Sequence, residues 1–366
     1  MQATNQMNPA HLWLRDETKP FERRTALTPD HAAILAGAGF KVTVEHSVQR
    51  CFADADYLAA GADMQPAGSW TGAPREAIIL GIKELPEAPA ALIHRHILFA
   101  HAYKGQAGWE STIRRFKAGG GTLLDLEFLV DEHGRRAAAF GRWAGFAGAA
   151  LAVDIWAHQQ VHGDMPFPAV RMVRDETELL EGLRERLRAA TRRNRTLPRA
   201  IIIGARGRCG SGALDLFTKL DFPLEGLTLW DMDETARGGP FMKILEHDIF
   251  VNCVLVQGGM KPFLDRETLR LPRKLSVISD VSCDPSSPHN PIPVYDRITT
   301  FADPVVRLDA ENLLDLSAID HLPSLLPRES SEDFGGQLLP HLLDLATESP
   351  VWDRARELYK TFEAKV

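Results

Sequence analysis

The chain has 366 residues, of which 45% are hydrophobic and 25% charged, a composition typical of folded globular proteins and a length sufficient for two domains. Its formal net charge is −7 and its 42 basic residues are dispersed among 49 acidic ones, which argues against binding to nucleic acid or to anionic membranes. No run approaches the roughly 20 apolar residues needed to cross a bilayer, and the polar start lacks the order of a signal peptide. We therefore expect a soluble, cytoplasmic protein.

The first 140 residues have the pattern of a complete α/β domain. The strand-like runs lie at 11–14, 41–46, 77–83, 96–103 and 122–129. Helix patterns lie between them, at 28–39 and at about 106–118; in the first, Thr28 suits the N-cap, Pro29 the first turn and Gly39 the end. Continuous apolar strands separated by helices predict a parallel sheet covered on both faces.

A second α/β pattern follows. Residues 140–161 are small and apolar all round, which predicts a buried helix joining two domains. The arginine-rich run 184–195 is expected to be the solvated face of a helix whose Leu183 and Leu187 point inward. Strands are predicted at 200–203, 227–231, 249–256 and 274–282, with the spacing of βαβ units.

These patterns predict an α/β protein with two Rossmann-like domains, parallel sheets and an active-site cleft between the domains. The last thirty or so residues read as helices that we expect to pack back on the first domain. The expected domains are therefore residues 1–140 with 325–366, which would bind substrate, and residues 141–324, which would bind a nucleotide.

The strand at 200–203 runs into Gly204, Gly207 and Gly210 and then into a helix expected to begin near Ser211. Glycines there allow a pyrophosphate to approach the helix N-terminus, although GxxGxxG is less usual than GxGxxG. About 20 residues further on, Asp231 follows a strand, where an acid binds ribose hydroxyls and repels a 2′-phosphate, so NAD is favoured over NADP. The alternative is an ordinary tight turn beside a surface acid.

The four cysteines are widely spaced and form no CxxC pair, so no metal site is expected; they are Cys51, Cys209, Cys253 and Cys283. Cys209 in the glycine loop and Cys253 on a later strand are candidates to be neighbours. Free thiols are expected in a reducing cytoplasm, but the sequence does not decide whether these two form a disulfide.

Several long segments match one family. They include RDETKPFERRTALTP (15–29), GIKELPE (81–87), FAHAYKGQAGW (99–109), LLDLEFL (123–129), GRRAAAFG (134–141), GARGRCGSGA (204–213), DVSCDPSSPHNPIP (280–293) and IDHLPSLLPRES (319–330). With these segments the chain resembles the NAD-dependent, lysine-forming saccharopine dehydrogenases, and more distantly alanine dehydrogenase and transhydrogenase. Residues 301–318 depart from the pattern, which leaves part of the expected cleft wall and the exact amine substrate open.

The resemblance implies that saccharopine is oxidised at its secondary amine and that the resulting imine is hydrolysed to lysine and 2-oxoglutarate. Lys83 matches the family's acid–base lysine, and its position after a buried strand would lower its pKa by desolvation. His101 matches the histidine that activates water, a task suited to imidazole near neutral pH. The alternatives are a lysine that merely reaches solvent at a strand end and a hydrogen-bonded core histidine.

Further site residues follow from the same matches. Arginines suited to substrate carboxylates are Arg24 and Arg136, with Arg23 and Arg135 as the neighbours most easily confused with them. The carboxylates and polar residues expected near the acid–base pair are Glu84, Glu127, Lys104 and Gln106. The residues expected to contact the cofactor are Gly204, Arg206, Gly207, Arg208, Gly210, Asp231 and Asp320, of which Asp320 is equally suited to cap a helix.

Two other functions remain open at this stage. An NAD-linked enzyme acting on another amine or keto acid, such as an opine- or alanine-dehydrogenase-like enzyme, would keep the arginines and change around 301–318. A non-catalytic NAD-binding protein would have lost the lysine and histidine, which this chain retains. The sequence decides neither the physiological direction nor the oligomeric state, and it is compatible with a monomer.

Overall fold

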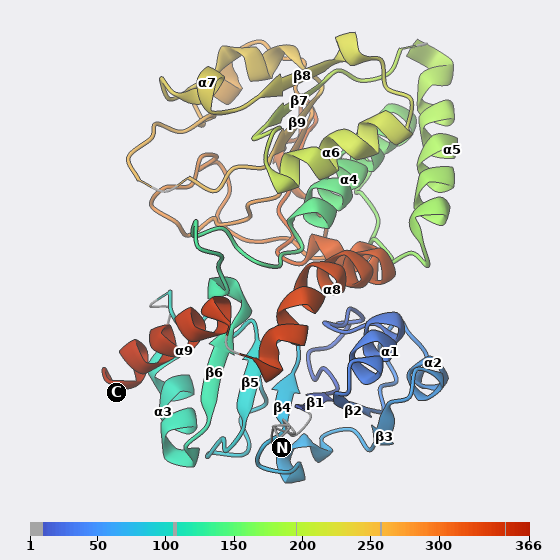
Figure 1. The fold of residues 1–366 in the computed structure, drawn as a ribbon. Helices are drawn as coiled ribbons and strands as arrows, with labels where there is room; N and C mark the ends of the chain where they lie inside the picture. Colours follow the sequence, from blue (N-terminus) through green and yellow to red (C-terminus); the bar gives the residue numbers. More distant parts are fainter. Residues whose placement is uncertain (1–9, 105–107, 195, 257, 348) are drawn as a thin grey trace, which may run out of the picture. The chain divides into compact units, whose positions relative to one another are not determined.

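A computed structural model describes residues 10–104, 108–194, 196–256, 258–347 and 349–366. The chain divides into two compact units: unit 1 holds the described residues up to Ala139 together with Pro327–Val366, and unit 2 is Phe140–Leu326. Each unit has its own six-stranded sheet (Figure 1), so the α/β fold class predicted from the sequence is confirmed. Within the described residues, no helix is both long and apolar enough to cross a membrane.

The sheet of unit 1 is parallel throughout and has the order β3-β2-β1-β4-β5-β6. Its strands are β1 His11–Leu14, β2 Lys41–Glu45, β3 Asp63–Gln65, β4 Ile78–Leu80, β5 Arg95–Leu98 and β6 Thr122–Asp125. Five of these strands were predicted; β3 was missed because it has three residues and no apolar run. The helical elements that precede unit 2 in the chain are α1 Pro29–Gly37, α2 Asp54–Ala59, η1 Ser69–Gly72, α3 Trp109–Gly119 and η2 Leu126–Phe128.

Helix α1 begins and ends where the sequence predicts. The Thr28 hydroxyl accepts a hydrogen bond from the His31 amide at 3.3 Å, which satisfies one of the unpaired N–H groups of the first turn. Gly39 follows the last turn with φ of 90°, a left-handed conformation that glycine adopts without steric cost. Three residues therefore separate the end of the helix from the start of β2.

The C-terminal helices belong to unit 1. They are α8 Pro327–Leu343, the short η7 Asp344–Ala346 and α9 Pro350–Glu363. Tyr359 of α9 is buried in the same apolar cluster as Trp13 of β1 and Phe116 of α3, and the Trp352 indole donates to the His341 carbonyl at 2.7 Å. The chain therefore returns to its first sheet after completing unit 2.

The sheet of unit 2 has the order β11-β12-β10-β9-β7-β8. Its strands are β7 Ala200–Ile203, β8 Leu227–Trp230, β9 Ile249–Asn252, β10 Val277–Asp280, β11 Val306–Asp309 and β12 Leu314–Ser317. Alternate residues face opposite layers: Ile202 and Val251 pack with the helices, whereas Ile201 and Phe250 pack with the segments on the other face. Its helical elements are α4 Gly141–His162, α5 Glu176–Asn194, α6 Arg208–Lys219, η3 Leu224–Gly226, α7 Met232–Thr235, η4 Met242–Glu246, η5 Thr268–Arg270 and η6 Leu322–Leu325.

One edge of the second sheet differs from the prediction of parallel strands. Strands β11 and β12 lie in the segment that departs from the family pattern, and they pair antiparallel. Only residues 310–313 join them, and a parallel pair would need a crossover of a dozen or more residues. The sequence signal is weak because Arg307 and Asp315 interrupt the apolar pattern, and these two side chains form an ion pair across the strands.

Helix α4 lies wholly in unit 2, so the expectation that it joins two domains is corrected. It packs directly on α6, and the contact depends on glycine: a Cβ on Gly145 would lie 1.8 Å from the Cys209 carbonyl oxygen, and one on Gly212 would lie 1.8 Å from that of Arg142. Helix α5 covers α4 with the buried Leu183 and Leu187, as predicted for the arginine-rich run.

Each sheet contains one point at which the chain reverses its direction of strand addition. In unit 1 this point lies between β1 and β4, and in unit 2 it lies between β7 and β9. Crossovers to the two sides leave a crevice beyond the carboxyl ends of such strands, where ligands of open α/β sheets bind. We call this end of each sheet its carboxyl edge.

We predict that Gly145→Ala lowers the stability of unit 2 by about 2–3 kcal/mol, because the methyl group forces α4 away from α6. Calorimetric unfolding of the whole chain measures the effect. The matched control is Gly336→Ala in α8, where a Cβ meets nothing within 4 Å, and where the change should be neutral or stabilising by up to about 1 kcal/mol. Equal stability of the two variants would contradict the close helix contact.

Candidate functional site

Lys83 lies just beyond β4, at the reversal point of the first sheet. Its side chain is half-buried, and no hydrogen bond or ion pair joins its amine to another residue in the described part of the chain. Burial lowers its pKa, as do the positive charges of Arg24 and Lys19, while Glu22 and Glu84 oppose the shift. The amine is therefore available and is more readily deprotonated than an ordinary lysine.

The loop after β1 brings Glu22 and Arg24 to this lysine. The Glu22 carboxylate accepts from Arg24 Nε at 2.8 Å and from Nη2 at 2.6 Å, and both side chains are buried. Burial alone would raise the pKa of Glu22, but the charge and hydrogen bonds of Arg24, together with Lys83, lower it. Two nitrogens of Arg24 are thus committed to Glu22, a partner that the sequence did not single out.

His101 lies beyond β5 and is the second candidate for acid–base chemistry. Its φ of 53° is in the left-handed region, which is uncommon for a residue other than glycine. The ring stacks on Phe99 with centroids 6.3 Å apart and makes no hydrogen bond to another described side chain or backbone group. Burial and then Lys104 and Lys83 lower its pKa, whereas Glu127 and Glu84 raise it. Glu84 thus acts on both candidates.

Glu127 joins two of the expected cations. Its Oε1 lies 2.9 Å from Lys104 Nζ and 2.5 Å from Arg136 Nη2. The neighbouring Arg135 instead pairs with Asp131 at 2.9 Å, in the turn that precedes it. Arg136 is therefore the arginine that faces this cluster. Gln106, which was also expected here, lies outside the described residues.

Asp125, which the sequence analysis did not single out, holds the backbone on which this cluster is built. It ends β6, and its carboxylate accepts from the Glu127 amide at 3.0 Å and from the Ala102 amide at 3.3 Å. It thereby ties the residue after His101 to the backbone of Glu127. Burial raises its pKa to about 6. A sequence signal existed, because an acid at a strand end before a turn suits such capping.

Arg23, like Arg135, lies apart from the expected site. Its charge acts on the Cys51 thiol, and its carbonyl accepts from the Cys51 amide at 2.9 Å. The structure therefore places Lys83, Arg24 and Glu84 in one group and His101, Lys104, Glu127 and Arg136 in another. Electrostatic interactions through Glu84 connect the two groups.

In unit 2 the glycine loop lies at the reversal point between β7 and β9. Gly204 has φ of 86°, and a Cβ there would lie 2.7 Å from Val254. A Cβ on Gly210 would lie 2.1 Å from the Gly204 carbonyl oxygen, so the loop requires glycine at both places. A Cβ on Gly207 would lie 3.4 Å from the Gly204 carbonyl oxygen, an ordinary contact, and the Gly207 amide donates to that oxygen at 3.1 Å.

Helix α6 begins at Arg208, three residues before the position that we expected. Gly207 is its N-cap residue, and the Ser211 amide is the first to bond back, to the Gly207 carbonyl at 2.9 Å. The amides of Arg208, Cys209 and Gly210 therefore belong to the first turn, whose N–H groups have no acceptor within the helix. This arrangement attracts an anion.

Asp231 follows β8 and contacts the same loop. Its carboxylate accepts from the Arg206 amide at 2.8 Å and from the Met232 amide at 2.9 Å, and it caps α7. An ionised carboxylate has about four acceptor positions, so capacity for ribose hydroxyls remains. The side chains of Arg206 and Arg208 are both exposed, and Arg206 also lies 3.3 Å from Asp233.

Asp320 follows β12 and pairs with the imidazole of His321. Its charge also acts on the Cys283 thiol. The next helical turn, η6, has His321 as its N-cap residue, and no side-chain cap hydrogen bond is seen there among the described residues. Asp320 thus lies at the carboxyl edge of the second sheet, directly before His321.

Cys209 and Cys253 are neighbours in unit 2, and both are free thiols, as are Cys51 and Cys283. Burial raises the pKa of the Cys253 thiol well above its ordinary value, and the adjacent Cys209 raises it further. The Cys253 thiol is therefore harder to deprotonate than an ordinary one, and a Cβ on Gly204 would lie 3.1 Å from the Cys253 backbone.

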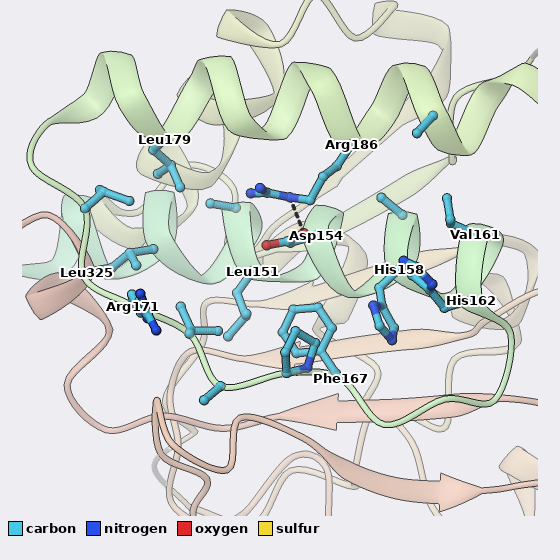
Figure 2. A pocket seen from close by; sticks show the side chains of 17 residues that line it. Leu151, Asp154, His158, Val161, His162, Phe167, Arg171, Leu179, Arg186 and Leu325 are labelled. Atoms are coloured by element: carbon cyan, nitrogen blue, oxygen red, sulfur yellow. Dashed lines mark ion pairs between the residues drawn. The ribbon is translucent and has the colours of Figure 1, made fainter.

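A separate cavity of about 490 Å³ lies in unit 2 between α4, α5 and residues 167–173 (Figure 2). It contains the ion pair of Asp154 with Arg186, 2.5 Å apart, and His158, whose ring meets Phe167 edge-on. Burial raises the pKa of Asp154 despite that arginine. Residues of the C-terminal half of α4 line the cavity. In this half of the helix the Gln159 side chain donates to the carbonyl of Ser276, the residue before β10. The cavity therefore lies toward the amino ends of the strands and away from the glycine loop.

Comparisons with known proteins agree with this arrangement. Residues 13–147 match the family described as alanine dehydrogenase/PNT, N-terminal domain. The solved structure of an L-alanine dehydrogenase superposes with a TM-score of 0.67 at 17% identity and covers 96% of this chain and 93% of its own, which shows the fold.

Much nearer relatives share the whole length of the chain. It is 50% identical over 364 residues to the saccharopine dehydrogenase (NAD(+), L-lysine-forming) of Schizosaccharomyces pombe, covering 97% of this chain and 99% of the relative. It is 51% identical over 359 residues to the enzyme of the same name from Neurospora crassa, covering 96% of each. The chain therefore belongs to the family of NAD(+)-dependent, L-lysine-forming saccharopine dehydrogenases.

Proposed function

We propose that this protein is a saccharopine dehydrogenase that uses NAD and forms L-lysine. The observation that carries the proposal is the grouping, at the carboxyl edge of one sheet, of a lysine whose amine pairs with none of the described residues and a partly exposed histidine, with the pKa values of both lowered. The reaction oxidises the C–N bond of saccharopine to an imine, and water then cleaves the imine to lysine and 2-oxoglutarate. Both steps need a base that is deprotonated near physiological pH, which for lysine requires a lowered pKa.

Each residue of unit 1 has a task in this reaction. Lys83 Nζ takes the proton of the substrate's secondary amine as the C–H bond gives up its hydride. A ring nitrogen of His101 then takes a proton from the water that attacks the imine carbon, and returns it to the leaving amine. Glu84 tunes both groups because its charge favours their protonated forms.

The substrate carries several carboxylates, which require cations. Lys104 and Arg136 both lie against Glu127, so their charges are partly balanced before substrate binds. A substrate carboxylate would share these two cations, and Arg24 would meet another beside Lys83. Guanidinium groups suit this task because they bind a carboxylate through two parallel hydrogen bonds.

Unit 2 has the features that a dinucleotide needs. Gly207 leaves the backbone open for a pyrophosphate, the first turn of α6 offers N–H groups, and Asp231 offers acceptors for ribose hydroxyls. Arg206 and Arg208 would bind the phosphates of NAD, and Asp320 would contact its nicotinamide half. Bound NAD supplies the acceptor for the hydride. We therefore assign substrate binding to unit 1, residues up to 139 with 327–366, and NAD binding to unit 2.

The first test is NADH oxidation at 340 nm with 2-oxoglutarate, comparing lysine with ornithine, alanine and ammonia. We expect a preference for lysine, and a loss of about 10²–10⁴-fold in kcat for Lys83→Met, the range for a missing acid–base group. The control is Lys41→Met, an exposed lysine at the amino end of β2. Tight NADH binding without a preference for lysine would overturn the substrate assignment and leave NAD-linked amine chemistry with another partner.

Replacing Glu84 by Gln should change the pH dependence of saccharopine oxidation. The carboxylate of Glu84 raises the pKa of Lys83 and of His101, so its loss lowers both. Activity rises with pH as these groups lose their protons, and the rising limb should therefore move to lower pH, by about 0.5 unit. Glu87→Gln, an exposed residue on the same segment, is the control; a shift of the limb to higher pH would contradict the assignment.

The third test concerns the choice of cofactor. Wild-type protein should bind NADH much more tightly than NADPH, and Asp231→Ser should weaken NADH binding by about 10- to 100-fold, the value of a charge-assisted hydrogen bond. Serine retains the ability to cap α7. Fluorescence titration measures both dissociation constants, with Glu225→Ser at the opposite end of β8 as control. If Asp231→Ser kept the wild-type preference for NADH over NADPH, the assignment of Asp231 to the ribose site would be wrong.

A further inference from the structure

A buried ion pair that the proposed mechanism does not use lies next to Lys83. Arg15 is 1% exposed and Glu17 is 8% exposed, and Arg15 Nη2 lies 3.1 Å from Glu17 Oε2. Both residues follow β1 directly, and Lys83 follows β4, the strand beside it. The pair therefore occupies the reversal point of the first sheet.

Both charges are directed at backbone groups of the segment 82–84. Glu17 Oε1 accepts from the Ile82 amide at 2.6 Å, and Oε2 accepts from the Lys83 amide at 3.0 Å. Arg15 Nη2 donates to the Lys83 carbonyl and lies 3.4 Å from that of Glu84. The amide and the carbonyl of Lys83 are thus both held by this one pair, while its amine is held by no described residue.

The neighbouring strand fixes the other side of the same segment. The Gly81 amide donates to the Ile97 carbonyl at 3.0 Å, and the Phe99 amide donates to the Ile82 carbonyl at 3.0 Å. The segment that carries Lys83 is therefore clamped between the ion pair and the strand that leads to His101. Such a clamp fixes where the Lys83 side chain starts, three residues beyond the end of β4.

The packing beside the pair leaves no room for a side chain at position 81. A Cβ on Gly81 would lie 2.5 Å from Arg15 Nε, so the guanidinium lies directly against the backbone of Gly81. Arg15 Nε is itself buried without a hydrogen-bond partner, and burial raises the pKa of Glu17 although Arg15 lowers it. Buried pairs of this kind seldom add stability over well-packed apolar residues. Stability alone therefore does not account for the pair.

We propose that Arg15 and Glu17 are positioning residues, which hold the backbone of Lys83 so that its amine meets the substrate nitrogen. The inference rests on the proposed function of Lys83. The pair acts on Lys83 through the position of its backbone and not through charge, because the charges that act most strongly on the amine are those of Arg24, Glu22, Lys19 and Glu84. Loss of the pair should consequently reduce the chemical step more than substrate binding.

The test variant is Glu17→Gln, which keeps the size of the side chain. Glutamine has one acceptor oxygen, so its NH₂ group must face one of the two amides that the carboxylate now accepts from. We expect kcat to fall by about 10- to 100-fold, since a displacement of about 1 Å can cost that much. The KM values for lysine and 2-oxoglutarate should change less than about threefold, and the Kd for NADH should not change.

Two further variants guard against a failure of this one to fold. Arg15→Lys replaces the planar guanidinium by a single ammonium, which cannot reproduce the fixed directions of its N–H groups. Gly81→Ala keeps both charges and pushes Arg15 aside. Asp315→Asn is the matched control: it breaks the buried pair with Arg307 and the bond to Gln159 in unit 2, away from the carboxyl edge, and should lower stability while retaining kcat.

A second readout needs no turnover. Trinitrobenzenesulfonate modifies neutral amines, so the rate of Lys83 modification against pH, followed by peptide mass spectrometry, reports the pKa of this lysine. In wild type that pKa should lie below the ordinary value because the amine is buried; in Glu17→Gln and Arg15→Lys it should rise toward that value, and in Asp315→Asn it should not move.

The outcomes separate the two ideas. A folded Glu17→Gln or Arg15→Lys protein with wild-type kcat and unchanged Lys83 modification overturns the positioning role, as does a rise in KM with kcat retained. A wild-type protein without lysine-dependent NADH oxidation overturns the proposed function instead, and the modification rates then still decide whether the pair positions Lys83.

Discussion

Parallel strands can be joined only by crossovers, and this constraint places the chemistry of the molecule. In each sheet the chain adds strands first on one side of a central strand and then on the other, so the loops at that point diverge and leave room beyond the strand ends. In unit 1 the loops that diverge carry Arg24 and Lys83; in unit 2 they carry Gly204 and Cys253. The candidate residues are thus brought together by strand order, although they are distant in sequence.

The electrostatics of unit 1 follow from the same crowding. Burial lowers the pKa of both Lys83 and His101, and each also faces one or more cations and carboxylates from neighbouring loops. Because the cations lower these pKa values and the carboxylates raise them, the net shift is a balance that single substitutions can move either way. Glu84 is the sensitive point of this balance, since it acts on both groups.

Sequence patterns predicted the fold class and most strands, because buried parallel strands are apolar runs with clear ends. They missed β3, β11 and β12, which are short or interrupted by charges that pair only in three dimensions, as Arg307 does with Asp315. The site residues came mostly from the family resemblance, and their roles remain predictions. Arg15 and Glu17 escaped notice because their importance lies in the backbone amides and carbonyls that they contact, which no side-chain pattern reveals. Glu22 was missed because its pairing with Arg24 depends on the fold of the loop after β1.

The two units solve one problem in different ways. In unit 2 the shape of the loop depends on missing side chains. Glycines let the end of the strand, the start of the helix and a neighbouring strand approach one another, and the backbone itself offers the N–H groups. Unit 1 shapes its loop with charged side chains, Arg15 and Glu17, that replace regular strand pairing beyond β4. The first solution suits a ligand bound through phosphates, for which backbone donors suffice. The second suits proton transfer, because a clamp on the backbone of Lys83 fixes the origin of the side chain, while no residue in the described part of the chain binds its amine.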